Sequence, residues 1–226
     1  MGGHSGFCPP WCSLVDPSLC RGCGSRRDLK LALRDLPVHA SLKHLLRGDA
    51  ALRDTLAELL GSDAELYELA AMVSDVGARR QAVHPDTPIE TGVEDGRPLV
   101  CTAFVALQDV TTEMGPTILW AGTHSAAAHA AWEEDKAGFL RGALPRVALL
   151  SKGDVLLFDS RLLHCGGANR EGRRALFYFS LKARRETRGI DRARHAAWWV
   201  AGRVRAGRGR GVVVLKLRVH SGLCIS

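Results

Sequence analysis

The stretch that most constrains the fold of this chain runs from Gly153 to Leu181. Residues 155–158 form an apolar run that is long enough for a buried strand and too short for a helix. Glycine-rich loops follow, and residues 175–181 form a second run that is rich in aromatic side chains. We therefore expect a strand, a turn and a second strand, with His164 at the end of the first strand.

Two adjacent arginines, Arg173 and Arg174, open the second strand. A hairpin of this kind would place a histidine, as a metal ligand, and a fixed cation on neighbouring strands. Adjacent residues in a strand point to opposite faces. Only one of the two arginines can therefore point inward.

Two further candidate ligands, His84 and Asp86, lie upstream of this hairpin. In an extended chain, residues i and i+2 point to the same face, so both side chains can reach one ion. Together with His164 they would supply two imidazoles and one carboxylate, the ligand set of non-haem Fe(II) oxygenases. His-Pro-Asp-Thr-Pro is also ordinary turn chemistry, so the assignment depends on all three residues.

Three segments of the chain resemble the phytanoyl-CoA dioxygenase family. They are HPD at 84–86, FVALQDVTTEMGPTILWAGTH at 104–124 and DSRLLHCGGANREGRRALFYFSL at 159–181. The resemblance covers about residues 30 to 182 and implies a double-stranded β-helix, a cupin-like jelly roll, with N-terminal helices beside it. Without the resemblance, the many short strands and turn signals predict only a β-rich chain with helices, of the α+β class.

The resemblance also implies a function. Members of the family are oxygenases that use Fe(II), 2-oxoglutarate and O2, so His84, Asp86 and His164 would hold the iron. A carboxylate at position 86 favours hydroxylation over halogenation, because related halogenases have a small residue there. We expect hydroxylation of an unactivated carbon in a small-molecule or acyl substrate, and nothing in the sequence selects among such substrates.

The co-substrate contacts follow from the same resemblance. The family pattern aligns best with Arg173 as the partner of the distal carboxylate of 2-oxoglutarate, with Arg174 as the reserve. Gln81 is a further candidate contact, although it would lie on the opposite face from His84 in a regular strand. An alternative is a catalytically inactive jelly roll that binds a metal or ligand.

The positive charge of the chain lies in its last part. The formal net charge is +7, and 11 of the 31 Lys/Arg but only 2 of the 24 Asp/Glu follow Lys182. Residues 183–226 therefore form a basic, Arg/Gly-rich tail with a net charge of +9, and the rest carries −2. RNA binding through this tail is the less favoured alternative, because no RNA-binding motif accompanies it.

Residues 1–27 are rich in Gly, Cys and Pro and are interpreted as a poorly ordered leader before a domain at 28–182. Its four cysteines, at 8, 12, 20 and 23, could instead hold zinc. No secretory signal or membrane-spanning stretch is evident. An odd number of cysteines, seven, without a secretory signal indicates a reducing compartment. We expect an intracellular, cytoplasmic protein that does not bind membranes or nucleic acid.

Regular secondary structure is expected on both sides of the candidate ligands. Leucines at spacings of three and four predict helices between Asp28 and Val76, the last of them starting near Ser62 and Asp63. Short strands are expected at 99–108, 118–120 and 147–150, and a partly helical segment at 125–141.

Overall fold

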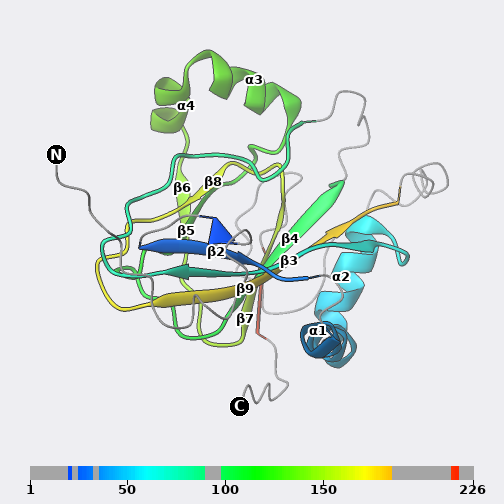
Figure 1. Ribbon diagram of the computed structural model, residues 1–226. Coiled ribbons are helices and arrows are strands. Elements are labelled where there is room, and N and C mark those ends of the chain that lie inside the picture. The colour runs from blue at the N-terminus through cyan, green and yellow to red at the C-terminus, as the bar shows by residue number, and fades with distance from the viewer. Residues whose placement is uncertain (1–19, 22–24, 33–35, 90–97, 185–214, 219–226) are drawn as a thin grey trace.

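The computed structural model describes residues 20–21, 25–32, 36–89, 98–184 and 215–218 (Figure 1). Most of the expected leader and tail lie outside these residues, and so do three of the four cysteines of the possible zinc site, at 8, 12 and 23. Arg26 and Arg27, which were assigned to the leader, belong instead to a strand of the main sheet. Leu215–Arg218 (β10), within the expected tail, pairs with the sheet as well.

The described strands form two antiparallel sheets. The larger has seven strands in the order β1-β2-β3-β9-β4-β7-β10, and the smaller has three in the order β6-β5-β8. The strands of the larger sheet are β1 (Cys20–Arg21), β2 (Arg26–Lys30), β3 (Glu65–Ser74), β4 (Val100–Ala106), β7 (Asp154–Asp159), β9 (Arg174–Lys182) and β10. Those of the smaller sheet are β5 (Thr117–Trp120), β6 (Pro145–Ala148) and β8 (His164–Gly166).

Helices α1 (Leu36–Gly48) and α2 (Ala50–Leu60) cover the outer face of the larger sheet. Asp49 begins α2 by accepting a hydrogen bond from the backbone N–H of Leu52 at 2.8 Å, as an N-cap residue does. Leucines of both helices pack on outward-facing residues of the strands, among them Ala103, Leu157 and Phe179. The predicted leucine pattern of these two helices is therefore confirmed as core packing.

A second core fills the space between the two sheets. It contains Phe104, Leu119, Leu156, Phe158, Leu176 and Tyr178. The rings of Phe104 and Phe158 meet edge to face with centroids 5.1 Å apart. The candidate site described below opens toward this interior.

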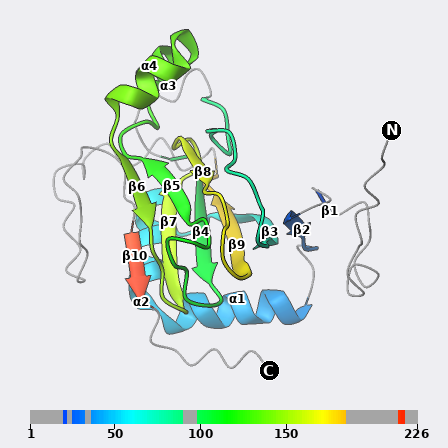
Figure 2. The same ribbon diagram turned by 90° about the vertical axis from the view of Figure 1, so that its left-hand side faces the viewer.

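Helices α3 (Ala126–Glu134) and α4 (Lys136–Gly142) cover the outer face of the smaller sheet. Trp132 of α3 packs in one cluster with Trp120 of β5 and Leu163. Figures 1 and 2 both place these helices at the opposite end of the molecule from α1 and α2. The α+β architecture of helices beside a jelly-roll core is as predicted, and the two sheets do not close into a barrel.

Residues 65–74 correct one expectation, because they form strand β3 and not a third helix. The register of β3 against β9 shifts between Leu66 and Glu68, which indicates a bulge. The bulge places Leu66 and Leu69 on the same face, where both pack in the cluster under the helices. A spacing of three residues therefore arises in a strand and resembles a helical pattern.

The connection between His164 and the arginines is a second correction. His164 begins β8 in the smaller sheet, whereas β7 and β9 belong to the larger sheet with β4 between them. The two strands do not form the expected hairpin. His164 and Arg174 instead belong to opposite sheets, whereas Arg173 precedes β9.

No helix in the described part of the chain is both long and apolar enough to cross a bilayer.

Candidate metal centre

Three side chains converge at the edge of the smaller sheet, and they are the predicted His84, Asp86 and His164. One donor atom of each lies within 4.8 Å of the other two. Asp86 Oδ1 is 3.4 Å from His164 Nε2 and 3.9 Å from His84 Nε2. The structure therefore brings together all three residues that the sequence selected as candidate ligands.

Backbone pairing between distant parts of the chain holds the two histidines together. His84 and His164 form an isolated antiparallel bridge in which each donates its backbone N–H to the carbonyl of the other at 3.0 Å. Their rings lie on the same side, with centroids 4.7 Å apart. The loop that carries His84 thus extends the edge of β8.

The outer ring nitrogens fix the orientation of both imidazoles. His84 Nδ1 lies 2.8 Å from the carbonyl of Ala82, and His164 Nδ1 lies 2.8 Å from that of Leu162. A carbonyl oxygen only accepts, so Nδ1 must carry the proton in each ring. When Nε2 carries no proton, as metal ligation requires, its lone pair points toward Asp86, and a hydrogen bond from Nδ1–H to a carbonyl commonly accompanies such ligation.

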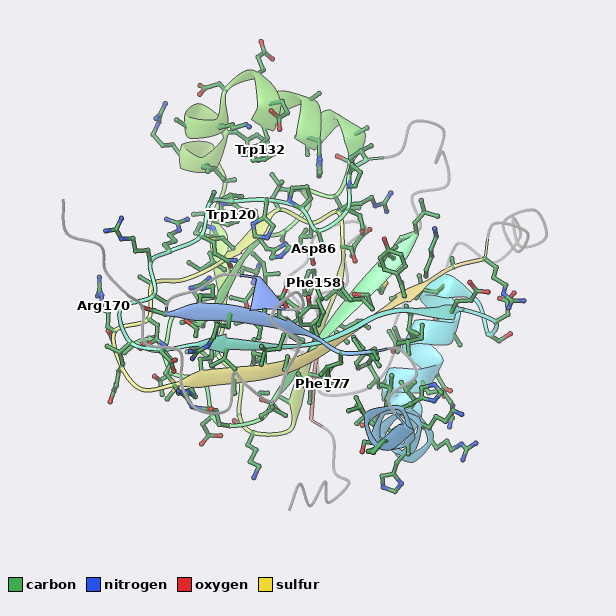
Figure 3. All side chains as sticks on the ribbon, viewed as in Figure 1. Asp86, Trp120, Trp132, Phe158, Arg170 and Phe177 are labelled. Carbon is green, nitrogen blue, oxygen red and sulfur yellow. The ribbon has the colours of Figure 1, made fainter. Side chains whose placement is uncertain are left out.

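Asp86 is held by its own backbone. Its N–H donates to the carbonyl of Ser160 at 2.8 Å, and the N–H of Thr87 donates to the same oxygen at 3.1 Å. The Asp86 side chain is about one-third exposed (35%), whereas that of His164 is buried. The site therefore has one deep ligand and one face that solvent reaches, and Figure 3 shows Asp86 near the middle of the molecule.

The charges of the ligands reinforce one another. Burial opposes the charged imidazolium of His164, but the bond to Asp86, its charge and the Leu162 carbonyl outweigh burial and raise the pKa of His164. Burial would likewise raise the pKa of Asp86, but the hydrogen bond and charge of His164, together with the charges of His84 and Lys30, lower it. The carboxylate is thus ionised and available to a cation.

The wall beside the deep ligand is apolar. The fully buried ring of Phe158 lies edge-on to that of His164, with centroids 5.1 Å apart. Leu119 pairs with His164 on the neighbouring strand and faces the same interior. The inner side of the triad is therefore lined by buried apolar side chains.

Arg174 points inward and Arg173 points outward, which is the reverse of the orientation that the sequence favoured. Arg173, the preferred inward residue, is half exposed and forms an ion pair with Asp75, its Nε donating to Oδ1 at 2.6 Å. Arg174 is fully buried and faces the space between the sheets. Arg174 is the first residue of β9 and shares a face with Leu176 and Tyr178, so the strand register decides this orientation.

The surroundings of Arg174 contain backbone and sulfur acceptors. Its Nη1 donates to the carbonyl of Gly115, and its Nη2 lies 3.7 Å from the sulfur of Met72. Burial, with a smaller contribution from the charge of Arg26, lowers the pKa of Arg174 to about 10. The guanidinium is thus still charged at neutral pH.

Gln81 supports the scaffold of the site. Its side-chain Oε1 accepts a hydrogen bond from the backbone N–H of Gly166 at 2.7 Å. Its backbone N–H donates to the carbonyl of Gly166 at 2.9 Å. Gln81 therefore holds β8 in place two residues beyond His164.

Sequence reasoning missed several polar residues that face the same interior. Lys30 Nζ donates to Tyr178 Oη at 2.6 Å and pairs with Glu68, and its charge acts on Asp86. Arg26 lies against Gly166 on the opposite sheet. Polar residues at alternate positions, Arg26, Asp28 and Lys30, could have indicated a strand with one polar face. The expected boundary of the leader, at residue 27, divided this pattern.

Comparison with known proteins was informative at the level of the family and the fold. A family model described as Phytanoyl-CoA dioxygenase (PhyH) matches residues 27–175. Among solved structures, AviO1 from Streptomyces viridochromogenes Tue57 is 19% identical with a TM-score of 0.52, over 69% of this chain and 66% of that one. EctD from S. alaskensis, with bound Fe, is 22% identical with a TM-score of 0.53, over 76% and 63% of the two chains.

HygX from Streptomyces hygroscopicus is a third similar structure, with nickel and 2-oxoglutarate bound. It is 18% identical with a TM-score of 0.52, over 76% of this chain and 75% of that one. At such identities these structures show a shared fold. The chain spans two thirds or less of the length of AviO1 and of EctD.

Proposed function

Because the chain belongs to the phytanoyl-CoA dioxygenase family, we propose that it is an Fe(II)- and 2-oxoglutarate-dependent oxygenase that hydroxylates an unactivated carbon of a small-molecule or acyl substrate. The observation that carries the proposal is the convergence of two imidazole Nε2 atoms and one carboxylate oxygen within 4.8 Å. Two histidines and a carboxylate on one face of an ion are the donor set of non-haem Fe(II) oxygenases.

The residues present fit Fe(II). Each imidazole is fixed by its Nδ1–H, so both lone pairs are directed inward without rearrangement. The ionised Asp86 supplies the negative charge that a divalent cation requires. When bound, Fe(II) with 2-oxoglutarate and O2 supplies the oxidising chemistry, and the protein supplies placement.

Asp86 also supports hydroxylation as the reaction type. A carboxylate that acts as a ligand occupies the position that the related halogenases leave open for a halide. The apolar wall of Phe158 and Leu119 would keep a reactive centre dry on its inner side and direct the substrate to the solvent-facing side near Asp86.

Arg174 is the residue that suits the distal carboxylate of 2-oxoglutarate. It is buried, charged and directed into the interior, and a guanidinium binds a carboxylate through two parallel hydrogen bonds. Arg173 is engaged by Asp75 on the outer surface. These observations support Arg174, the reserve candidate of the sequence, in the role for which the family pattern favoured Arg173.

A small-molecule substrate accords with one similar structure, because HygX has been solved with nickel, 2-oxoglutarate and hygromycin B bound. That ligand belongs to HygX, and the class of substrate is a proposal for this chain.

The test is anaerobic visible absorption of the protein titrated with Fe(II) and then 2-oxoglutarate, beside His164→Ala. We expect a weak metal-to-ligand charge-transfer band in the wild type and none in the variant. Release of succinate on admitting O2 would then identify an oxygenase. A folded, iron-binding wild type that shows no band and releases no succinate would contradict the proposal in favour of a catalytically inactive metal-binding jelly roll.

A further inference from the structure

A row of polar side chains crosses the inner face of the larger sheet. The register of β2, β3 and β9 aligns Arg26, Ser74 and Arg174 on three neighbouring strands. Ser74 and Arg174 are fully buried. Within the described residues, Ser74 Oγ, Arg174 Nε, and both Nε and Nη1 of Arg26 are buried atoms without a hydrogen-bond partner.

Such a concentration of unpaired polar atoms is unusual in a protein interior, where buried polar groups nearly always find partners. The unpaired atoms are N–H donors of two guanidiniums, with a hydroxyl between them. These groups can all donate hydrogen bonds to one bound ligand. Such a ligand must be an anion with several acceptor oxygens.

The positive charges of Arg26 and Arg174 also indicate an anionic ligand. No carboxylate in the described part of the chain lies within ion-pair distance of Arg26 or Arg174. The two cations act on each other, since the charge of Arg26 contributes to the lowered pKa of Arg174. A buried cation without a counter-charge is costly, and an anion between the two guanidiniums would remove both the repulsion and the unpaired donors.

The opposite sheet shows how Arg26 comes to point into this space. Gly166 faces the interior two residues after His164, and a Cβ at this position would overlap Arg26 Nη1. The absent side chain therefore admits the guanidinium. Arg26 Nη2 donates to the carbonyl of Gly167 at 2.7 Å and to that of Arg79 at 3.2 Å, which fixes the group in place.

Two residues along a strand span about 6.6 Å. A ligand that starts at the side chain of His164 and ends opposite Gly166 therefore has the reach of a short dicarboxylate chain. 2-Oxoglutarate has this length and carries a carboxylate at its far end.

We propose that Arg26, Ser74 and Arg174 together bind the distal carboxylate of the keto acid, with Arg26 as a second guanidinium that makes the site selective for dicarboxylates. This inference rests on the function proposed above. The hydroxyl of Ser74 donates to the same carboxylate from between the two cations.

The test is calorimetric titration of the full-length protein, loaded with Ni²⁺, with 2-oxoglutarate and with 2-oxovalerate, which has the same chain length but no distal carboxylate. Arg26→Met is expected to weaken 2-oxoglutarate binding about tenfold to a hundredfold, because a charge-assisted hydrogen bond is lost. The affinity for 2-oxovalerate should not change. Arg27→Met is the matched control, since Arg27 is adjacent on β2 but binds Asp75 on the other face.

Ser74→Ala provides a second variant should Arg26→Met fold poorly. Its expected effect is about twofold to tenfold on 2-oxoglutarate alone. The inference would be overturned if Arg26→Met kept the wild-type preference for 2-oxoglutarate over 2-oxovalerate. If Arg26→Met does not fold, the same result in Ser74→Ala would overturn it. So would a wild type that binds both keto acids equally.

Failure of the proposed function would look different, because the Ni²⁺-loaded wild type would then bind neither keto acid. Glutarate, which lacks the keto group, decides the inference in that case. Stabilisation of the wild type against heat by glutarate, lost in Arg26→Met, would still identify a carboxylate site at the two arginines. No stabilisation by glutarate would overturn it.

Discussion

The close packing of Gly115 against the loop after β8 leads to a stability prediction with an internal control. Gly115 has a φ of +67°, in the left-handed region. A Cβ at this position would lie 2.5 Å from the Gly167 carbonyl oxygen and 2.7 Å from the carbonyl carbon and oxygen of Ala168. These are backbone atoms of the segment that follows the candidate ligand His164, so they cannot move away cheaply.

The expected size of the effect follows from two separate costs. A left-handed backbone costs a residue with a Cβ about 1–2 kcal/mol. Forcing an extra carbon into close-packed surroundings adds about 1–3 kcal/mol. We therefore expect Gly115→Ala to lower the free energy of unfolding by about 2–5 kcal/mol.

Gly122→Ala is the matched control. Gly122 has a φ of +83°, but nothing lies within 4 Å of a Cβ at that position. It should show only the backbone cost of about 1–2 kcal/mol. The difference between the two variants then isolates the steric contact at Gly115.

Urea unfolding of the two variants and the wild type measures these values by linear extrapolation. A second readout follows from the hydrogen bond of Arg174 to the Gly115 carbonyl, since Gly115→Ala should also weaken 2-oxoglutarate binding and Gly122→Ala should not. Equal losses of stability in the two variants would refute the steric argument.

Three further predictions concern the site. Asp86→Ala and His164→Ala should each weaken Ni²⁺ binding by more than about a hundredfold, measured calorimetrically with melting temperature as the folding control, because they remove ligands and not merely the groups that orient them. Arg174→Met should cost about 2–5 kcal/mol of 2-oxoglutarate binding free energy, whereas Arg173→Met, on the outer face, should leave it unchanged; the reverse result would restore the sequence-based assignment. The raised pKa of His164 means that its charged form stabilises the metal-free fold at low pH and that this stabilisation is lost as pH rises through the folded-state pKa. Because a proton competes with the metal for Nε2, Ni²⁺ affinity should increase over the same range, and a pH-independent affinity would contradict the ligand assignment.

The sequence identified the candidate metal ligands because their chemistry is local. His84 and Asp86 are two residues apart, and the later His164 completes a ligand set that few kinds of site share. The family pattern favoured Arg173 over Arg174, and the residues of β9 could not correct this preference because the strand is covered on both faces. Apolar residues occupy both sets of alternating positions, so no pattern in the strand distinguishes inward from outward.

Other features depended on contacts that sequence spacing does not record. Leu66 and Leu69 look helical because a bulge places them on one face of a strand. Arg26 looked like part of an unstructured leader because the pairing that gives it a position is with β3, more than forty residues later. Gly166 looked like a turn residue, and only the opposite sheet shows that its missing side chain makes room for a guanidinium.

The backbone bridge between His84 and His164 has a consequence for how the site responds to an ion. Backbone hydrogen bonds from Gln81 and His84 to β8, and from Asp86 to the carbonyl of Ser160, hold the ligand-bearing loop without any contribution from the ligand side chains. An arriving ion therefore meets a preorganised site and loses little of its binding energy in ordering the chain. Removal of the ion should correspondingly leave amide hydrogen exchange in the loop nearly as slow as before, so that the same scaffold can be loaded and emptied repeatedly without unfolding.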